Sequence, residues 1–438
     1  MGWSQVSPTR WECHLMGIED YFTFTAEVSA NLFAGRQHYI FSSIFKLAID
    51  LPDPESALKQ AWKQLRYEQP QIAATTEAYK KIYEVPDTES ALQSWVDETF
   101  IVSPFDTAEE LSQTAPAINQ ATLYYLPTSS ELVSTCTTRL MTGSFNALTN
   151  PSPSPEALGF KPHTPPTPEQ SEKSSARLMA YLNNLPRIGP PFLVGKTPAG
   201  PCRTLQRTLS PQTTAAVIKR SKELGITVTS AVHAAYILML QNLNRNHLSL
   251  TATTNTTRYT GITAHNMRRH IPALANPKYA TVGLYYACQF TTIPLPASYL
   301  DLCQALNRHY KSTIDAETLS VHDAFTQTLA AIVRSPEYQS APIPTDATTS
   351  SLGVVERYTD HSYQNTDPDG QVRGKVEVVD DKICCNIVLG MITVHFWTFR
   401  EVLRLVYGFN EAYEEPRNVE GCLEEMERVL VGELVGGV

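Results

Sequence analysis

The stretch SPQTTAAVIKRSKELGITVTSAVHAAYILML (Ser210–Leu240) predicts two successive helices and sets the architecture of the second half of the chain. Ser210 and Pro211 are typical of a helix N-cap and of the first helical position, because the hydroxyl accepts a free backbone N–H and proline has none to leave unpaired. Gly225 is expected to end this helix. The second helix follows at once and runs to about Asn244. Its surface is almost wholly apolar, so we expect it to be buried on most sides.

Short strands and amphipathic helices are expected on both sides of this helix pair. Two β-prone runs around a Thr-Ser-Ser turn predict a hairpin, and apolar residues at helical spacing predict one helix near each end of the chain. Helices and strands in mixed order favour an α+β fold over a regular β/α repeat. The runs are the hairpin strands Ala121–Pro127 and Glu131–Thr138, the later strands Thr281–Pro294, Val376–Val379, Gly390–Phe399 and Leu403–Asn410, and the helices Pro54–Arg66 and Val419–Val431.

A proline-rich segment divides the chain. Twelve of the 30 prolines fall between Pro151 and Pro201. Proline fixes φ and lacks the N–H that helices and inner strands use, so residues 151–175 are not expected to form a helix. The predicted organisation is therefore an N-terminal lobe (1–150), a proline-rich crossover (151–205) and a C-terminal lobe (206–438).

Composition excludes several classes of protein. The formal charge is −9 and no Lys/Arg-rich run occurs, so neither a nucleic acid nor a membrane is an expected partner. The most apolar window, Ala231–Leu240, is too short to cross a bilayer, and the N-terminus lacks a secretory pattern, so we expect a cytoplasmic chain. The eight cysteines form no CxxC pair, so no metal site is expected. GxSxG and GxGxxG are absent as well, and we expect no cofactor.

Four segments carry a resemblance to a known superfamily. They are Ala57–Ala73, Ser210–Leu240, Asn266–Phe290, and the pair Ser351–Tyr358 with Val394–Tyr413. Their order resembles the chloramphenicol acetyltransferase-like superfamily, which includes the condensation domains of peptide synthetases. Within it, the chain is most similar to the fungal branch that contains the trichothecene 15-O-acetyltransferases. The resemblance implies two lobes, each a mixed sheet flanked by helices, with a tunnel between them and the reaction centre midway.

The motif that carries the chemistry of this superfamily is degenerate here. Acyl-transferring members have His-His-x-x-x-Asp-Gly, whose second histidine is the general base. The matching window is TTRLMTG (137–143), which keeps the length and the glycine. Threonine stands at both histidine positions and at the aspartate position. A threonine hydroxyl is not a base near pH 7, so general-base catalysis is lost there.

Three functions stay open at this point. The favoured one is cofactor-independent cyclisation, of the pericyclase or Diels–Alderase type, of a hydrophobic polyketide or terpenoid intermediate. Such a reaction needs a folded substrate and hydrogen-bond donors rather than a base. Thr138, Arg139 and Thr142 would be the donors. The alternatives are acyl transfer from acyl-CoA to a hydroxyl with a substitute base, and a non-catalytic binding protein for the intermediate. In each case we expect a monomer.

Further residues are candidates for the tunnel wall. His395 alternates with Trp397 in the predicted strand that the resemblance places near the tunnel, which makes it the best substitute base. Tyr285 and Tyr286 are neighbours on a strand, so only one of them can face the tunnel. His233 and Cys136 are expected to be core residues, whereas His265, His309 and His361 are expected at the surface. The substrate-binding candidates are Thr137, Tyr124, Tyr285, Tyr286, His395 and Trp397.

Overall fold

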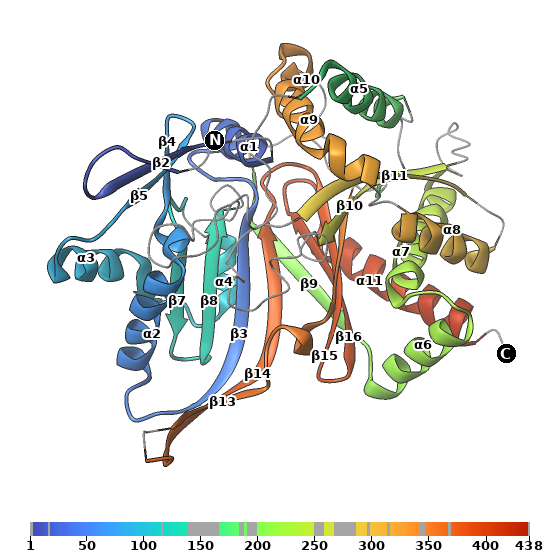
Figure 1. Ribbon diagram of the computed structural model, residues 1–438. Helices are drawn as coiled ribbons and strands as arrows, with labels where there is room; N and C mark the ends of the chain where they lie inside the picture. The colour runs from blue at the N-terminus through green and yellow to red at the C-terminus, as the bar shows by residue number, and fades with distance from the viewer. Residues whose placement is uncertain are drawn as a thin grey trace.

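The computed structural model describes residues 3–15, 18–114, 117–137, 166–183, 188–190, 199–248, 258–266, 286–295, 298–312, 316–340, 347–366 and 369–436. Two six-stranded sheets lie next to each other and form the body of the protein (Figure 1). Each sheet is mixed, with parallel and antiparallel neighbours. The α+β class with two mixed sheets flanked by helices is therefore confirmed.

The first sheet combines strands from both halves of the chain. Strand β14 comes from the second half of the chain. It pairs antiparallel with the whole of β3, from Lys375 opposite Asp50 to Asn386 opposite Ile40. The two sheets thus do not divide at a single point in the sequence. In spatial order the strands are β13 (Ser362–Thr366), β14 (Val372–Asn386), β3 (Ile40–Asp50), β8 (Glu131–Thr137), β7 (Thr122–Leu126) and β6 (Phe100–Val102).

The second sheet belongs to the second half of the chain. Its order is β11 (Tyr286–Pro294), β10 (Arg258–Asn266), β12 (Ala347–Val354), β15 (Ile392–Phe399), β16 (Val402–Asn410) and β9 (Cys202–Thr208). Gly261 of β10 lets the Tyr259 side chain fold across it, since a Cβ there would collide with the phenol oxygen. A small third sheet is formed by β1 (Ser4–Gln5), β2 (Arg10–His14), β5 (Lys80–Glu84) and β4 (Thr75–Glu77).

The helix pair of the second half forms as predicted. Ser210 accepts the backbone N–H of Thr213 at the start of α6 (Pro211–Glu223), and Gly225 has a positive φ of 66° just after its end. Helix α7 (Val228–Leu248) is almost fully buried between Ala231 and Leu240. Helices α6, α7, α8 (Tyr299–Ser312) and α11 (Pro416–Leu434) lie along one side of the second sheet (Figure 1).

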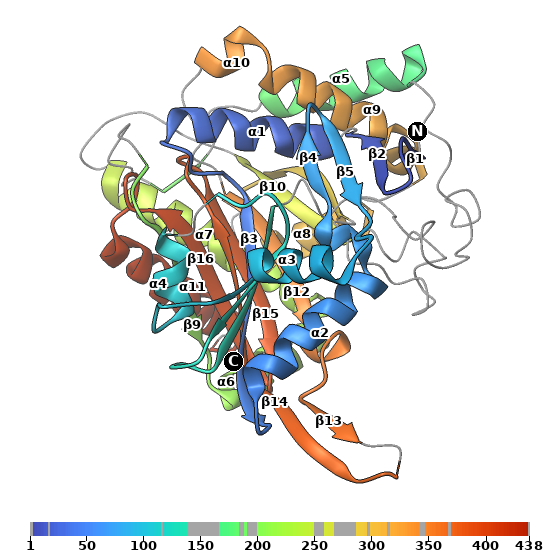
Figure 2. The same cartoon turned by 90° about the vertical axis from the view of Figure 1, so that its left-hand side faces the viewer.

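The remaining helices border the first sheet or lie across the upper end of the molecule. Helices α2 (Pro54–Glu68), α3 (Glu89–Thr99) and α4 (Ala108–Thr114) belong to the first lobe. The others are α1 (Ile18–Leu32), α5 (Pro168–Leu182), α9 (Ala316–Val333) and α10 (Pro336–Ser340), which lie together at the top of Figure 2.

Helix α5 corrects one prediction, because it begins inside the segment that was not expected to be helical. Thr167 accepts the backbone N–H of Gln170, and the Gln170 side chain accepts the backbone N–H of Thr167, which completes a capping box. Pro168 occupies the first helical position, where no intrahelical N–H is needed. A proline at that position starts a helix rather than preventing one.

Apolar side chains join the two sheets. Trp397 and Phe399 of β15 pack against Leu47 of β3 and Val378 of β14. Both faces of the second sheet are therefore buried, one under helices and the other against the first sheet. Among the described residues, no single helix is long and apolar enough to cross a membrane; α6 and α7 satisfy that criterion only as a pair bent by 105°.

Candidate functional site

The side chain of His395 lies between the two sheets. Along β15, Ile392, Val394 and Phe396 point to the helices of the second lobe, so His395 and Trp397 point the opposite way, towards the first sheet. The His395 ring meets the ring of Phe41 on β3 edge to face, with centroids 6.3 Å apart.

This position lies beside the end of strand β8. Phe41 is paired across the sheet with Cys136, and Thr137 is the last residue of β8. The degenerate window, residues 137–143, begins at that point. The fold thus brings His395 close to the end of β8, although more than 250 residues separate the two along the chain.

His395 is buried without a polar partner. It is 4% exposed, and neither ring nitrogen has a hydrogen bond within the described part of the chain. Burial lowers the pKa of His395 to about 4, so the imidazole is neutral at pH 7. A neutral imidazole carries one donor and one acceptor nitrogen, and leaving both unsatisfied in a protein interior is costly. Within the described residues, both ring nitrogens of His395 therefore lack the hydrogen bond that a buried imidazole normally has.

Thr393 adds a second polar group to the same strand face. It lies two residues before His395, which places the two side chains about 7 Å apart on β15. Its hydroxyl is buried, and it too lacks a hydrogen-bond partner among the residues that the structure describes. Gly408 is its cross-strand neighbour, and a Cβ there would collide with the Thr393 hydroxyl. Sequence analysis missed Thr393, although its alternation with His395 and Trp397 was a usable signal.

Most of the other predicted site residues lie outside the described part of the chain or at its edge. Thr138, Arg139, Thr142 and Tyr285 lie outside the described residues, and Thr137 and Tyr286 are described only as the last residue of β8 and the first of β11. Trp397 is 1% exposed and donates its indole N–H to Asp381, 3.3 Å away, so it contributes to the core between the sheets.

Tyr124 lies on the opposite face of the first sheet from His395. It packs with Leu126 and with Ala108 and Leu111 of α4. Because residues 124 and 126 of a strand share one face, the structure does not bring Tyr124 together with the side chains between the sheets.

For two histidines, the predicted position at the surface is wrong. His265 is only 8% exposed and contacts Thr263, and His309 is partly buried and contacts Thr291. The two threonines in turn share a hydrogen bond of 3.2 Å, which links the histidines in a polar network inside the second lobe. His361 is exposed, as predicted.

The predicted core residues His233 and Cys136 are buried, as expected. His233 contacts the phenol oxygens of Tyr310 and Tyr259 at 2.9 and 3.1 Å, so both of its ring nitrogens are satisfied. This full set of partners separates His233 from His395 and fits a structural role. Burial raises the pKa of the Cys136 thiol to about 12, which excludes it as a thiolate nucleophile at neutral pH.

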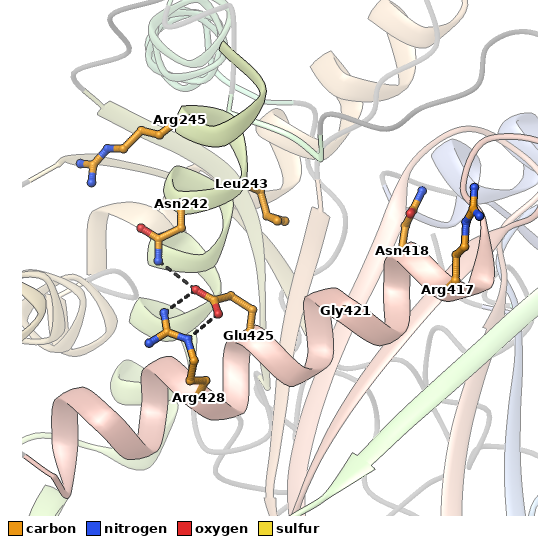
Figure 3. A pocket seen from close by; sticks show the side chains of 8 residues that line it. All are labelled: Asn242, Leu243, Arg245, Arg417, Asn418, Gly421, Glu425 and Arg428. Carbon is orange, nitrogen blue, oxygen red and sulfur yellow. Dashed lines mark hydrogen bonds and ion pairs between the residues drawn. The ribbon is translucent and has the colours of Figure 1, made fainter. Parts of the chain in front are cut away.

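The described residues form at least two pockets. One, of about 710 Å³, lies between α7 and α11 and is open to solvent (Figure 3). In it Glu425 bonds both Arg428 and Asn242, so the carboxylate already offsets part of the basic charge. The other, of about 490 Å³, lies between α2, α3 and β5. Within the described ranges, no group of three or more His, Cys, Asp or Glu side chains could hold a metal ion.

Comparison with known proteins identifies relatives in fungal biosynthesis. The O-acetyltransferase pigM of Monascus ruber is 25% identical over 87% of this chain and 77% of its own length. The acetyltransferase pigO of the same organism is 23% identical over 99% of this chain and 98% of its own length. No family model matches the chain.

A solved structure has the same architecture. The trichothecene 15-O-acetyltransferase TRI3 from Fusarium sporotrichioides superposes with a TM-score of 0.75 at 16% sequence identity, covering 99% of this chain and 98% of the other. The fold predicted from the four segments, that of the chloramphenicol acetyltransferase-like superfamily, is therefore confirmed.

Proposed function

We propose that this chain is an acyltransferase of a fungal secondary-metabolite pathway, which transfers an acyl group from a coenzyme A thioester to a hydroxyl group. The observation that carries the proposal is His395, a buried imidazole without a polar partner in the described residues, between the sheets and beside the end of β8. The names of the two Monascus ruber proteins support this reaction class. We therefore place acyl transfer, an alternative in the sequence analysis, before the cyclisation that the degenerate window alone favoured.

His395 would act as the general base. A neutral ring nitrogen takes the proton of the acceptor hydroxyl while the oxygen attacks the thioester carbonyl. The tetrahedral intermediate then collapses, the C–S bond breaks, and the imidazolium returns its proton to the leaving thiolate. Proton and electron pairs balance without any further reactant. A hydroxyl such as that of Thr393 would donate to the negative charge that develops on the carbonyl oxygen.

Cofactor-independent cyclisation is the second candidate function. It is favoured by one observation in the sequence, that Thr138 and Thr142 replace the histidine and the aspartate of the motif. In that reaction His395 and Thr393 would only donate hydrogen bonds to a carbonyl of the substrate, and no acyl donor would be consumed. The two candidates therefore differ in their dependence on acetyl-CoA.

The test is an assay with acetyl-CoA and a panel of hydroxylated polyketide and terpenoid acceptors, read by mass spectrometry. We expect a product heavier by one acetyl group, and at least a hundredfold lower kcat for His395→Ala. His361→Ala removes an exposed histidine and is the matched control, with unchanged activity expected. An isomer of unchanged mass formed without acetyl-CoA, or full acetyl transfer by His395→Ala, would overturn the proposal.

A further inference from the structure

The pocket between α2, α3 and β5 has a buried cation in its wall. Arg66, from the last turn of α2, is 6% exposed and lines this cavity of about 490 Å³. Its guanidinium lies over the ring of Trp95, 4.6 Å from the centroid, and donates to the backbone carbonyl of Glu84 at 2.9 Å. Its Nε is buried and has no hydrogen-bond partner among the residues that the structure describes.

In the described part of the chain, no carboxylate forms an ion pair with the buried guanidinium of Arg66, whose partners there are the Glu84 carbonyl and Tyr83. Burial lowers the pKa of Arg66, and the interaction with Tyr83, which includes a side-chain hydrogen bond, opposes this shift without a carboxylate contributing. Buried cations are ordinarily balanced by an anion, because removing a charge from water without compensation is unfavourable. A negatively charged ligand would provide the missing balance.

Other groups around the cavity are also donors. Gln120 uses its carbonyl oxygen to accept the indole N–H of Trp95, which leaves its amide N–H groups to donate. The hydroxyls of Thr9, Thr75 and Ser94 line the same cavity. One carboxylate of the lining, that of Glu84, is exposed and pairs with Arg10 at 3.1 Å, so the charged and amide donors left to meet an anion in this pocket are those of Arg66 and Gln120.

The rim and the walls restrict which anion fits. Asp87 and Glu98 are exposed carboxylates at the rim and repel a ligand with several negative charges. Ile82, Val85 and Pro86 supply an apolar wall. The cavity is within the range of small-molecule sites, which combine apolar walls with a few convergent polar groups.

We propose that this pocket binds a small organic monocarboxylate, with the carboxylate on Arg66 and Gln120 and the apolar part against Ile82 and Val85. The site lies in the first lobe at the edge of its core, to which the lining residues Ala73 and Trp95 belong, and it is independent of His395 and of the reaction proposed for it. Its ligand class is a single carboxylate on an apolar body, such as an aliphatic or aromatic acid.

The test is a calorimetric titration of the full chain with benzoate and with hexanoate, against the neutral amides benzamide and hexanamide. We expect saturable binding of at least one carboxylate with a Kd of about 1 mM or tighter, and binding of its amide at least about tenfold weaker. Arg66→Met should abolish carboxylate binding. Arg245→Met, which changes an exposed arginine of the pocket in Figure 3, is the matched control and should leave the affinity unchanged.

Gln120→Leu provides a second variant should Arg66→Met fail to fold, and we expect it to weaken carboxylate binding about tenfold. Three results would each overturn the proposal: no saturable binding of either carboxylate to the unmodified chain, equal affinity for the carboxylate and its amide, or inorganic phosphate binding as tightly as benzoate.

Discussion

Arg404 of β16 and Asp381 of β14 form an ion pair between the two sheets. Their Nη1 and Oδ1 atoms are 2.9 Å apart, and each side chain is only 6% exposed. Arg404 also bonds Asp380, at 2.6 Å, and Asp381 accepts the indole N–H of Trp397. The pair lies in the same layer as His395, so it helps to set the separation of the sheets at the proposed site.

Removing one partner of this pair should destabilise the protein strongly. Arg404→Met leaves the Asp381 carboxylate buried and uncompensated, and we expect a loss of about 3–5 kcal/mol in the free energy of unfolding. The double variant Arg404→Met with Asp381→Asn removes the stranded charge as well, and it should recover part of that loss. Urea denaturation measures both. A loss below about 1 kcal/mol in the single variant would mean that the pair does not join the sheets.

Local signals accounted for much of the fold but not for the junction of the sheets. The Ser210 cap and Gly225 were readable because capping depends on residues a few positions apart. The pairing of β14 with β3 was not, because no local pattern encodes which distant strand completes a sheet. Helix α5 shows the converse case: prolines indicated a break, whereas the capping box around Thr167 made one of them a helix start.

The candidate site shows the same division. The resemblance placed the strand that carries His395 and Trp397 near the tunnel, and alternation put the two side chains on one face; in the structure both lie between the sheets. Alternation could not tell that Trp397 bonds Asp381 of β14 while His395 has no such partner among the described residues, because a partner on another strand leaves no local pattern. The same limit applies to His265, whose polar surroundings in sequence suggested the surface although β10 is buried on both faces.

Thr393→Val tests the second polar group beside His395. Valine has the same shape and removes only a hydroxyl that lacks a partner in the described residues, so the free energy of unfolding should stay the same or rise by about 1 kcal/mol. If the hydroxyl stabilises the developing negative charge, kcat should fall about a hundredfold with KM little changed. Thr393→Ser keeps the hydroxyl and should retain most of the activity. Unchanged kcat in Thr393→Val would exclude this role.

The pH dependence of acyl transfer should be unusual for a histidine base. The reaction needs the neutral imidazole, and burial lowers the pKa of His395 to about 4, so the active form is fully populated well below neutral pH. We expect kcat to be flat between about pH 5.5 and 8. A histidine of ordinary pKa near 6.5 would instead lose about tenfold in this interval as the pH falls to 5.5. Such a tenfold loss would show that His395 is solvated in the working enzyme.

Glu414 should destabilise the protein as the pH rises from about 4.5 to above 7. It is fully buried, its Oε2 has no partner in the described residues, and Tyr407 donates to its Oε1 over a long 3.5 Å. Burial raises the pKa of Glu414 to about 7, so the folded protein retains a proton that the unfolded chain releases near pH 4.5. Stability contributed by the protonated carboxyl is therefore complete below about pH 4.5 and declines as the pH rises through 7, by about 3 kcal/mol in total.

Glu414→Gln mimics the protonated form and should remove this decline. The difference in the free energy of unfolding between this variant and the unmodified chain should therefore grow from about pH 5 to pH 8, in favour of the variant. Denaturation in urea at both pH values measures the difference, and Glu411→Gln, at a partly exposed carboxylate paired with Arg203, is the control without such a trend. An equal effect of Glu414→Gln at the two pH values would show that Glu414 is ionised in the fold.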